Sequence, residues 1–411
     1  MAIKSSGNVR KIKGKDFLKS DMNSLYKAKQ LILVLAALVS RNFLKIFYVF
    51  SIEEKKILFC SHQGNGYICN PKYIYMYFKS KSENKFKYVW VFNKPREFLR
   101  MEDSETIVLK INSLKFFYHF LTAKFIIINS SNFPYIPKRR KQIIINTWHG
   151  GGAYKKIGQE NNIDMYKKIT ICDFSYMVSS CRKFTNVMSK AFTKNDENKF
   201  LNIGMPRNDI FFRNYQDIIQ RTLDKLQLSE SKKYILCAPT WRLEQEDYDL
   251  NFQQLLEICK RKFGGEWVVL FRSHKYHKIN TLKKLINEEY VIDVSEYDDM
   301  QELICISNIL ITDYSSCMWD MLLTRKPCFI YAQDIERYTR CNGFYVPPSA
   351  WPFLIAKNNE ELEHNIMHFK DDIYREKIKM HCKDLGCFEN GNATKAIYDF
   401  LKEKLINKGT N

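Results

Sequence analysis

The sequence predicts an α/β protein made of two doubly wound, Rossmann-like domains that face a central cleft. Runs rich in β-branched and apolar residues recur along the chain, a helical pattern follows each run, and polar or glycine-rich residues come directly after several of them. Continuous apolar strands separated by crossover-length segments are typical of parallel sheets covered on both faces. With roughly 150 residues per domain, the 411 residues leave room for two domains and an appendage.

The predicted strands are short and bounded by turns. They lie at 55–61, 88–93, 123–130, 142–148, 174–180, 199–204, 233–241, 267–274, 290–295, 308–316 and 326–332. A polar helical stretch at 212–233 falls between two strand-rich blocks and predicts the domain boundary. We therefore expect a first domain at 51–228 and a second domain at 229–390. Ligands of such a pair bind in the cleft at the carboxyl ends of the strands.

Composition narrows the class of protein. Hydrophobic residues make up 45% and charged residues 27%, which excludes disorder throughout and a polytopic membrane bundle. The net charge of +20 indicates an anionic partner, and nucleic acid, an acidic membrane surface and a phosphorylated substrate all satisfy it. The 12 cysteines include no C-x-x-C pair, which argues against zinc ribbons and a secreted disulfide framework. We interpret them as reduced thiols in the cytosol.

Residues 1–50 differ from the rest of the chain. They carry ten Lys or Arg and two Asp, and an apolar run extends from Leu31 to Val39 before Arg41 and Lys45 interrupt a second apolar stretch. A spanning helix needs about 20 nearly uncharged residues, and a secretory signal would begin earlier and show a cleavage site. We expect a basic amphipathic segment in the inner-leaflet interface, where each basic residue contributes about 1 kcal/mol. The alternative is an ordinary helix packed on the core.

The first candidate site segment follows the strand at 142–148. It reads Asn146-Thr147-Trp148-His149-Gly150-Gly151-Gly152. Consecutive glycines let backbone N–H groups approach an anion closely, and we expect a helix starting there to add its positive end. His149 is suited to act as a general base, and Lys155 and Lys156 lie just beyond. The structural alternative is a satisfied histidine beside a tight turn.

Two cationic segments follow strands of the second block. Arg272, His274 and Lys275 at the end of the strand at 267–274 suit phosphate oxygens, with a solvated basic loop as the alternative. In the other segment, 237–242, Arg242 either binds a phosphate or pairs with an acidic residue nearby, at 244 or 246. On its own this second signal is weak.

A hydroxyl-rich segment closes the strand at 308–316 and leads into a helical pattern. It contains Thr312, Asp313, Tyr314, Ser315 and Ser316. Hydroxyls and N–H groups at a helix N-terminus cap the helix, and they also bind phosphate. The two roles coexist, because capping leaves donors available for an incoming anion.

In order and spacing, these segments resemble the CDP-glycerol glycerophosphotransferase family of teichoic-acid and capsule polymer synthesis. The resemblance is carried by NTWHGGGAYKKIG, NIGMPRNDIFF, ILCAPTWR, LFRSH and ELICISNILITDYSS, covers about residues 55–400, and includes SHQGNGYICNPKYIY. It implies a GT-B fold with the acceptor held mainly by the first domain, the CDP-linked donor by the second, and a final helix at 391–411 returning to the first domain. It also implies peripheral attachment to the cytoplasmic face of the plasma membrane, through the segment at 1–50.

The resemblance also assigns roles to individual residues. It makes His149 the base that activates the acceptor hydroxyl and His274 the group that binds or polarises the transferring phosphoryl group. The implied donor-binding residues are Gly150, Gly151, Pro239, Thr240, Arg242, Arg272, Thr312, Asp313, Ser315 and Ser316, and those of the acceptor side or cleft are Lys155, Arg207 and Asp209. Teichoic-acid members commonly have Thr-Pro where this chain has Gly151-Gly152, so the acceptor or polyol is expected to differ.

The implied activity is transfer of glycerol phosphate or ribitol phosphate from a CDP-polyol to a hydroxyl of a lipid-linked or growing teichoic-acid or capsule polymer, with release of CMP. Fixed cations and N–H dipoles would stabilise the transferring charge. No cofactor is expected to be required, and a divalent cation is not indicated, because Asp298-Asp299 precede a predicted helix and no Asp-x-Asp ends a strand. The alternatives are a GT-B glycosyltransferase that uses a nucleotide sugar and a nucleic-acid-binding protein, for which no recognition motif is present.

Overall fold

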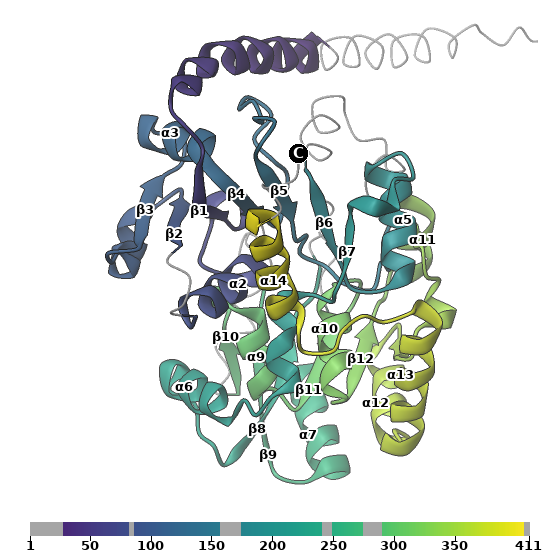
Figure 1. Ribbon diagram of the computed structural model, residues 1–411. Coiled ribbons are helices and arrows are strands. Elements are labelled where there is room, and N and C mark those ends of the chain that lie inside the picture. The colour runs from purple at the N-terminus through teal and green to yellow at the C-terminus, as the bar shows by residue number, and fades with distance from the viewer. Residues whose placement is uncertain (1–27, 82–85, 157–173, 241–248, 274–289, 407–411) are drawn as a thin grey trace, which may run out of the picture.

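The computed structural model describes residues 28–81, 86–156, 174–240, 249–273 and 290–406 (Figure 1). Within these residues the chain forms two parallel sheets, one after the other along the sequence. The first has the strand order β3-β2-β1-β4-β5-β6-β7 and the second has the order β10-β9-β8-β11-β12-β13. Both orders run outward in two directions from a central strand, which is the doubly wound arrangement that the sequence predicts.

The strands are short and mostly buried. The first sheet contains β1 (Glu53–Cys60), β2 (Lys87–Phe92), β3 (Thr106–Lys110), β4 (Ala123–Ile128), β5 (Ile143–Asn146), β6 (Tyr176–Ser179) and β7 (Phe200–Asn202). The second contains β8 (Lys232–Cys237), β9 (Glu266–Phe271), β10 (Val291–Asp293), β11 (Ile309–Thr312), β12 (Cys328–Tyr331) and β13 (Leu354–Ala356). All eleven predicted strands are present, and β3 and β13 are strands that the sequence did not predict.

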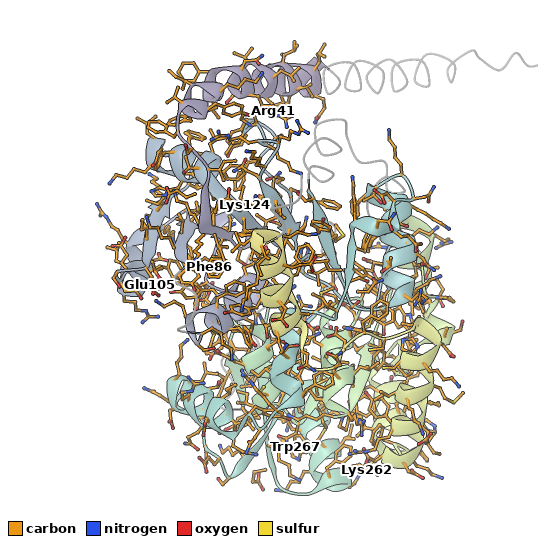
Figure 2. All side chains as sticks on the ribbon, viewed as in Figure 1. Arg41, Phe86, Glu105, Lys124, Lys262 and Trp267 are labelled. Carbon is orange, nitrogen blue, oxygen red and sulfur yellow. The ribbon has the colours of Figure 1, made fainter. Side chains whose placement is uncertain are left out.

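Helices connect the strands and cover both sheets, and side chains fill the space between them (Figure 2). The described α-helices with numbered elements are α2 (Cys69–Lys79), α3 (Leu114–Thr122), α5 (Arg182–Phe192), α6 (Gln216–Leu226), α7 (Phe252–Phe263), α9 (Met300–Ile306), α10 (Cys317–Thr324), α11 (Ile335–Cys341), α12 (Asn359–Met367), α13 (Asp371–Leu385) and α14 (Ala393–Ile406). Asp299 caps α9 by accepting from the Gln301 backbone N–H, so this carboxylate is used at a helix start, as expected.

The chain crosses from one domain to the other twice. The first passage includes the 3₁₀ helix η6 (Pro206–Phe212) and α6, and the second follows α13 and leads to α14. Helix α14 packs against α2 and η6 of the first half, where the rings of Phe78 and Tyr398 lie 4.9 Å apart. Figure 1 shows this last helix, in yellow, lying beside elements of the first sheet. The C-terminal segment thus contributes to the first domain.

The apolar segment near the N-terminus forms a helix longer than the uncharged run. The helix Ala28–Val49 includes Arg41 and Lys45, and by length and composition alone it is long and apolar enough to cross a membrane. Only 11% of its most apolar stretch is buried. Val34, Ala37 and Leu44 are buried, whereas most of its other large apolar side chains are exposed. This exposure differs from that of an ordinary core helix.

Candidate active site

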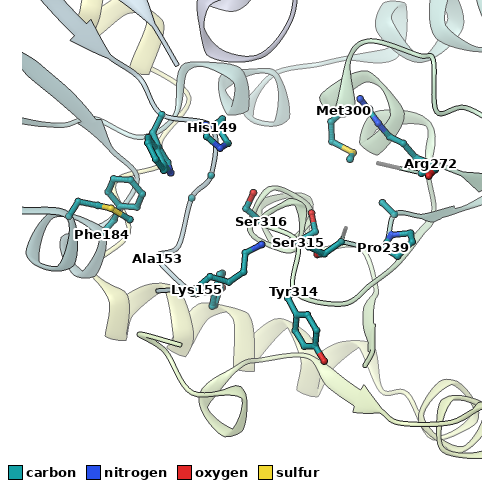
Figure 3. A pocket seen from close by; sticks show the side chains of 18 residues that line it. His149, Ala153, Lys155, Phe184, Pro239, Arg272, Met300, Tyr314, Ser315 and Ser316 are labelled. Atoms are coloured by element: carbon teal, nitrogen blue, oxygen red, sulfur yellow. The ribbon is translucent and has the colours of Figure 1, made fainter. Parts of the chain in front are cut away.

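A cavity of about 350 Å³ lies where the carboxyl ends of the two sheets meet (Figure 3). The residues that line it follow β5 in the first sheet and β8, β9 and β11 in the second, together with a few side chains from helices. They are Trp148, His149, Gly150, Gly151, Ala153, Tyr154, Lys155, Phe184, Met188, Ala238, Pro239, Thr240, Arg272, Ser273, Met300, Tyr314, Ser315 and Ser316. Sheet topology therefore brings together segments that lie up to about 170 residues apart, as expected for two doubly wound domains.

His149 is held by its neighbours in a defined orientation. Its Nδ1 lies 2.7 Å from the Asn129 carbonyl oxygen, and because a carbonyl only accepts, Nδ1–H donates and Nε2 keeps its lone pair. The Trp148 ring stacks on the imidazole with centroids 4.7 Å apart. Asn70 fixes the turn by donating from Nδ2 to the carbonyl oxygens of Thr147 and Trp148, at 3.1 and 3.0 Å. This is the tautomer that a general base requires.

Electrostatics keep this imidazole neutral. His149 is exposed on the side of the cavity, while Trp148, His62 and the Asn129 carbonyl lie against the ring. Burial and the nearby His62, Arg207 and Lys155 lower the pKa of His149 to about 3, against the opposing hydrogen bond from Nδ1. Desolvation and neighbouring positive charges both disfavour imidazolium. His149 is therefore unprotonated at Nε2 at neutral pH.

The glycine turn packs closely against the second domain. A Cβ on Gly151 would lie 2.2 Å from Trp319 Cδ1, and one on Gly150 would lie 3.1 Å from Ser316 Oγ. Gly152, at φ +72°, donates its N–H to Ser180 Oγ at 3.1 Å. The expected helix start at the glycines is wrong for Gly150–Lys156, which form turns and a single β-bridge. The helix end at this place belongs instead to α10, against which the turn packs.

The opposite wall offers hydrogen-bond donors. Thr240 donates its backbone N–H to both carboxylate oxygens of Asp313, at 2.8 and 3.0 Å. The Thr240 hydroxyl and Arg272 Nη1 are buried without a hydrogen-bond partner among the described residues, whereas Arg272 Nη2 donates to the Asp298 carbonyl at 3.2 Å. Burial lowers the pKa of Arg272, against the opposing pull of Asp299 and other acidic groups. A guanidinium nevertheless stays charged in a protein.

Ser315, Ser316 and Lys155 form the floor between the two walls. Ser316 is the residue before α10, and Figure 3 shows the Lys155 amine directed toward Ser315 and Ser316. Burial lowers the pKa of the Lys155 ammonium, while the Asp313 carboxylate opposes this. An anion placed here would favour the charged amine. The floor thus combines an amine, two hydroxyls and a helix N-terminus.

Several predicted residues lie behind the cavity rather than on it. Thr312 is buried and donates its hydroxyl to the Ala238 carbonyl at 2.7 Å, and Asp313 holds the Thr240 loop. Arg207 pairs with both oxygens of Asp320, at 3.0 and 2.9 Å. Asp209 accepts from the backbone N–H groups of Ala393 and Thr394, so it caps α14. Arg242 and His274 lie outside the described residues; Ser273, the neighbour of His274, lines the cavity.

Some residues of the site have partners that are distant along the chain, and local sequence patterns do not reveal them. Asn129, which orients His149, is a polar residue directly after a fully buried strand, and that position was a usable signal. Glu389 accepts from Met205 N–H at 2.9 Å, Trp319 Nε1 at 3.0 Å and Asn208 Nδ2 at 3.1 Å. Burial raises the pKa of Glu389 to about 8. Among the described residues, no group of three or more His, Cys, Asp or Glu side chains is placed to hold a metal ion, and metal independence stays a prediction.

The family model of CDP-glycerol:poly(glycerophosphate) glycerophosphotransferase matches residues 42–403. The chain belongs to this family. The match spans both sheets and the cavity between them. The family resemblance proposed from the strand-end motifs is therefore confirmed.

Comparisons with individual members of the glycerophosphotransferase family agree with the family match. The teichoic acid poly(glycerol phosphate) polymerase of Bacillus spizizenii is 30% identical over 373 residues, which are 85% of this chain and 92% of that protein. The polymerase of the same name from Staphylococcus epidermidis is 30% identical over 380 residues, 86% of this chain but only 51% of that longer protein. A solved structure of the wall teichoic acid polymerase TagF superposes with a TM-score of 0.78 at 26% identity and covers 94% of this chain and 99% of its own. The GT-B-like fold is thereby confirmed.

Proposed function

We propose that this chain is a transferase that moves a polyol phosphate, glycerol phosphate or ribitol phosphate, from a CDP-polyol to a hydroxyl of a growing teichoic-acid or capsule polymer and releases CMP. Family membership supports the reaction class, and the B. spizizenii and S. epidermidis relatives carry the name of a poly(glycerol phosphate) polymerase. One observation in the structure carries the proposal. A neutral imidazole faces, across one cavity, the Arg272 Nη1 and the Thr240 hydroxyl, which have no hydrogen-bond partner within the part of the chain that the structure describes.

The unsatisfied donors fit a pyrophosphate. Leaving a buried donor without a partner costs about 1–3 kcal/mol, so such groups in a native cavity need an explanation. Arg272 Nη1 and the Thr240 hydroxyl are such donors among the described residues. Lys155 and the serines before α10 complete the set from the floor. Phosphate oxygens of a CDP-linked donor would satisfy all of them together.

The reaction follows from this arrangement. The acceptor hydroxyl gives its proton to His149 Nε2 as its oxygen bonds to the β-phosphorus of the donor. The bond between this phosphorus and the CMP oxygen breaks, and CMP leaves with the electron pair. Arg272, Lys155 and the N–H groups at α10 would hold the charge that spreads over the transferring oxygens. His274, outside the described residues, is assigned to the same phosphoryl group by the family resemblance.

The test incubates the purified chain with a panel of CDP-alcohols and a synthetic oligo(glycerol phosphate), and follows CMP. We expect CMP release with CDP-glycerol or CDP-ribitol that depends on the oligomer, together with growth of the oligomer by whole polyol phosphate units. Consumption of a nucleotide sugar, with every CDP-alcohol inert, would replace the proposal with the glycosyltransferase alternative. Salt-sensitive retention on duplex DNA with no turnover would favour the nucleic-acid alternative.

The enzyme is further proposed to work at the cytoplasmic face of the plasma membrane, held there by the helix Ala28–Val49. Exposed side chains on this helix include Leu31, Leu35, Val39 and Phe43. Its end is fastened to the first domain, because Arg139 donates to the Phe50 carbonyl at 2.7 Å and lies over the Tyr48 ring. Figure 1 shows the helix lying across the end of the first domain, an orientation that suits contact along a membrane surface.

Vesicle flotation tests this attachment. We expect the full chain to float with vesicles that contain an anionic lipid and a chain without residues 1–50 to stay in solution, while both turn over a water-soluble acceptor. Replacing the exposed Leu35 and Phe43 by Ser should weaken flotation without loss of turnover. Equal flotation of all three proteins would refute the role of this helix.

A further inference from the structure

A second imidazole lies beside His149 on the side of the first domain. The rings of His62 and His149 have centroids 5.4 Å apart and are tilted by 54°. His62 comes two residues after the end of β1, whereas His149 follows β5, and β4 lies between these strands. The two rings therefore meet at the carboxyl edge of the first sheet, above the end of β4.

The position of His62 in the sheet is the place where a doubly wound domain binds its ligand. Strand order reverses between β1 and β4 in the first sheet and between β8 and β11 in the second. Ligands of open α/β sheets bind in the crevice outside such a reversal. In the second domain this crevice carries Thr240 and Ser315, which line the cavity. In the first domain the corresponding crevice carries His62.

The two crevices are built alike at the level of hydrogen bonds. In the second domain, the residue after β11 is Asp313, and its carboxylate accepts the backbone N–H of Thr240 in the loop after β8. In the first domain, the residue after β4 is Asn129, and its side-chain oxygen accepts the backbone N–H of His62 at 2.7 Å. The Asn129 carbonyl also accepts from the His149 ring at 2.7 Å. Asn129 thus positions both the loop that carries His62 and the ring of His149, the proposed base.

The loop holds His62 in an unusual conformation. His62 and Gln63 have φ of +44° and +56°, and Gly64 follows at +86°. Non-glycine residues in this region cost about 1–3 kcal/mol each and persist where the surroundings over-determine them. The surroundings here are the bonds from Asn93 to the carbonyl oxygens of Gly64 and Gln63 and from Asn65 Nδ2 to the His62 carbonyl. This backbone conformation determines the direction in which the His62 imidazole leaves the chain.

We infer that His62 binds the acceptor, through a hydrogen bond from its imidazole to the polyol phosphate unit that carries the attacking hydroxyl. Apart from Lys155, the proposed donor-binding groups Thr240, Arg272, Ser315 and Ser316 lie on the second domain. The side of His149 that faces His62 and the first domain is therefore left for the acceptor. A polyol phosphate acceptor offers further hydroxyl and phosphate oxygens within a few bonds of its nucleophile. An imidazole whose centroid lies 5.4 Å from that of the base is suited to hold them. This inference rests on the proposed function.

The experiment separates acceptor binding from donor binding and from turnover. Purified full-length wild type, His62→Phe, His62→Ala and His62→Gln are compared at saturating CDP-glycerol with a synthetic oligo(glycerol phosphate) of fixed length. We expect the KM for the oligomer to rise about tenfold in His62→Phe and His62→Ala, the size expected for one lost hydrogen bond. The KM for CDP-glycerol should change less than about twofold, and His62→Gln should recover part of the loss.

Direct binding and a matched control complete the design. Calorimetric titration of the oligomer into each protein without donor should show the same loss of affinity in His62→Phe. The variant His368→Phe, which removes an exposed histidine directly after α12, should behave as wild type. An unchanged acceptor KM and affinity in both His62→Phe and His62→Ala would overturn the inference while leaving the proposed function intact. A wild-type chain that consumes no CDP-alcohol would overturn the proposed function itself.

Discussion

The contact between Gly151 and Trp319 leads to a quantitative prediction for the variant Gly151→Ala. The added methyl carbon would lie 2.2 Å from Cδ1 and 2.5 Å from Nε1 of the Trp319 ring. Non-bonded heavy atoms pack at about 3.5–4.0 Å, so the turn and the ring must separate by roughly 1.3–1.8 Å. The turn carries His149 two residues earlier, and the ring lies on α10, the helix that presents Ser315 and Ser316.

The expected cost appears in turnover more than in folding. A misplacement of about 1 Å between reacting groups costs about 100-fold in rate, and overpacking costs about 1–3 kcal/mol in stability. The assay measures kcat for CMP release and the midpoint of thermal unfolding of the same preparation. Gly264→Ala is the control for turnover only. A Cβ there would meet nothing within 4 Å, but the φ of +65° disfavours any residue other than glycine, so this variant should lower the unfolding midpoint. It should keep wild-type turnover.

A second substitution, which removes the contact, tests whether the clash causes the loss of turnover in Gly151→Ala. Trp319→Leu makes room beside the turn, although it removes the hydrogen bond from Nε1 to Glu389. The double variant Gly151→Ala, Trp319→Leu should therefore be faster than Gly151→Ala alone, a non-additive result of the kind that residues in contact produce. Wild-type kcat in Gly151→Ala, or a double variant slower than the product of both single effects, would refute the reasoning.

Three further predictions concern the base, a buried ion pair and a buried acid. His149→Ala and His274→Ala should each lower kcat at least about 100-fold with folding intact, and since the pKa of His149 is lowered to about 3, wild-type kcat/KM should not fall near pH 6.5 as it would for an ordinary histidine. Arg207→Met should lower the free energy of unfolding, measured with urea, by about 3–5 kcal/mol, and adding Asp320→Leu should restore most of this loss. Equal stability of the single and double variants would contradict this prediction. The pKa of Glu389 is raised to about 8, so the folded state holds the extra proton and stability should fall as pH rises from about 5 to 8; the fall should be smaller in Glu389→Gln, and parallel pH profiles would count against it.

Local patterns predicted the sheets well because a buried parallel strand is apolar along its whole length. β4, with all six residues buried, is such a strand. β13 is as short as β7 and β10, which were predicted, but it follows the segment 347–352, whose three prolines are typical of a loop. β3 was missed because its five residues follow the acidic segment at 102–105 and lie at the edge of the sheet.

Site residues that come soon after the end of a strand were predicted correctly. The roles of residues that depend on a partner distant along the chain were missed. His149, Thr240, Arg272 and the serines before α10 follow strands directly, and all line the cavity. Arginine is a residue type that commonly binds anions, so Arg207 was expected in the cleft. Its actual partner, Asp320, lies 113 residues away along the chain and could not be identified from the sequence. The glycine run resembles a helix start, yet its conformation is set by the Trp319 ring of the other domain.

The two passages of the chain between the domains touch each other, since Glu389 in the second accepts from Met205 and Asn208 in the first. Two adjacent covalent tethers define a single pivot line. A rotation about this line would widen the mouth of the cavity while the contacts at Glu389 keep their length. A cross-link placed far from the pivot should consequently stop access of the polymer, whereas one placed beside Glu389 should leave it unhindered.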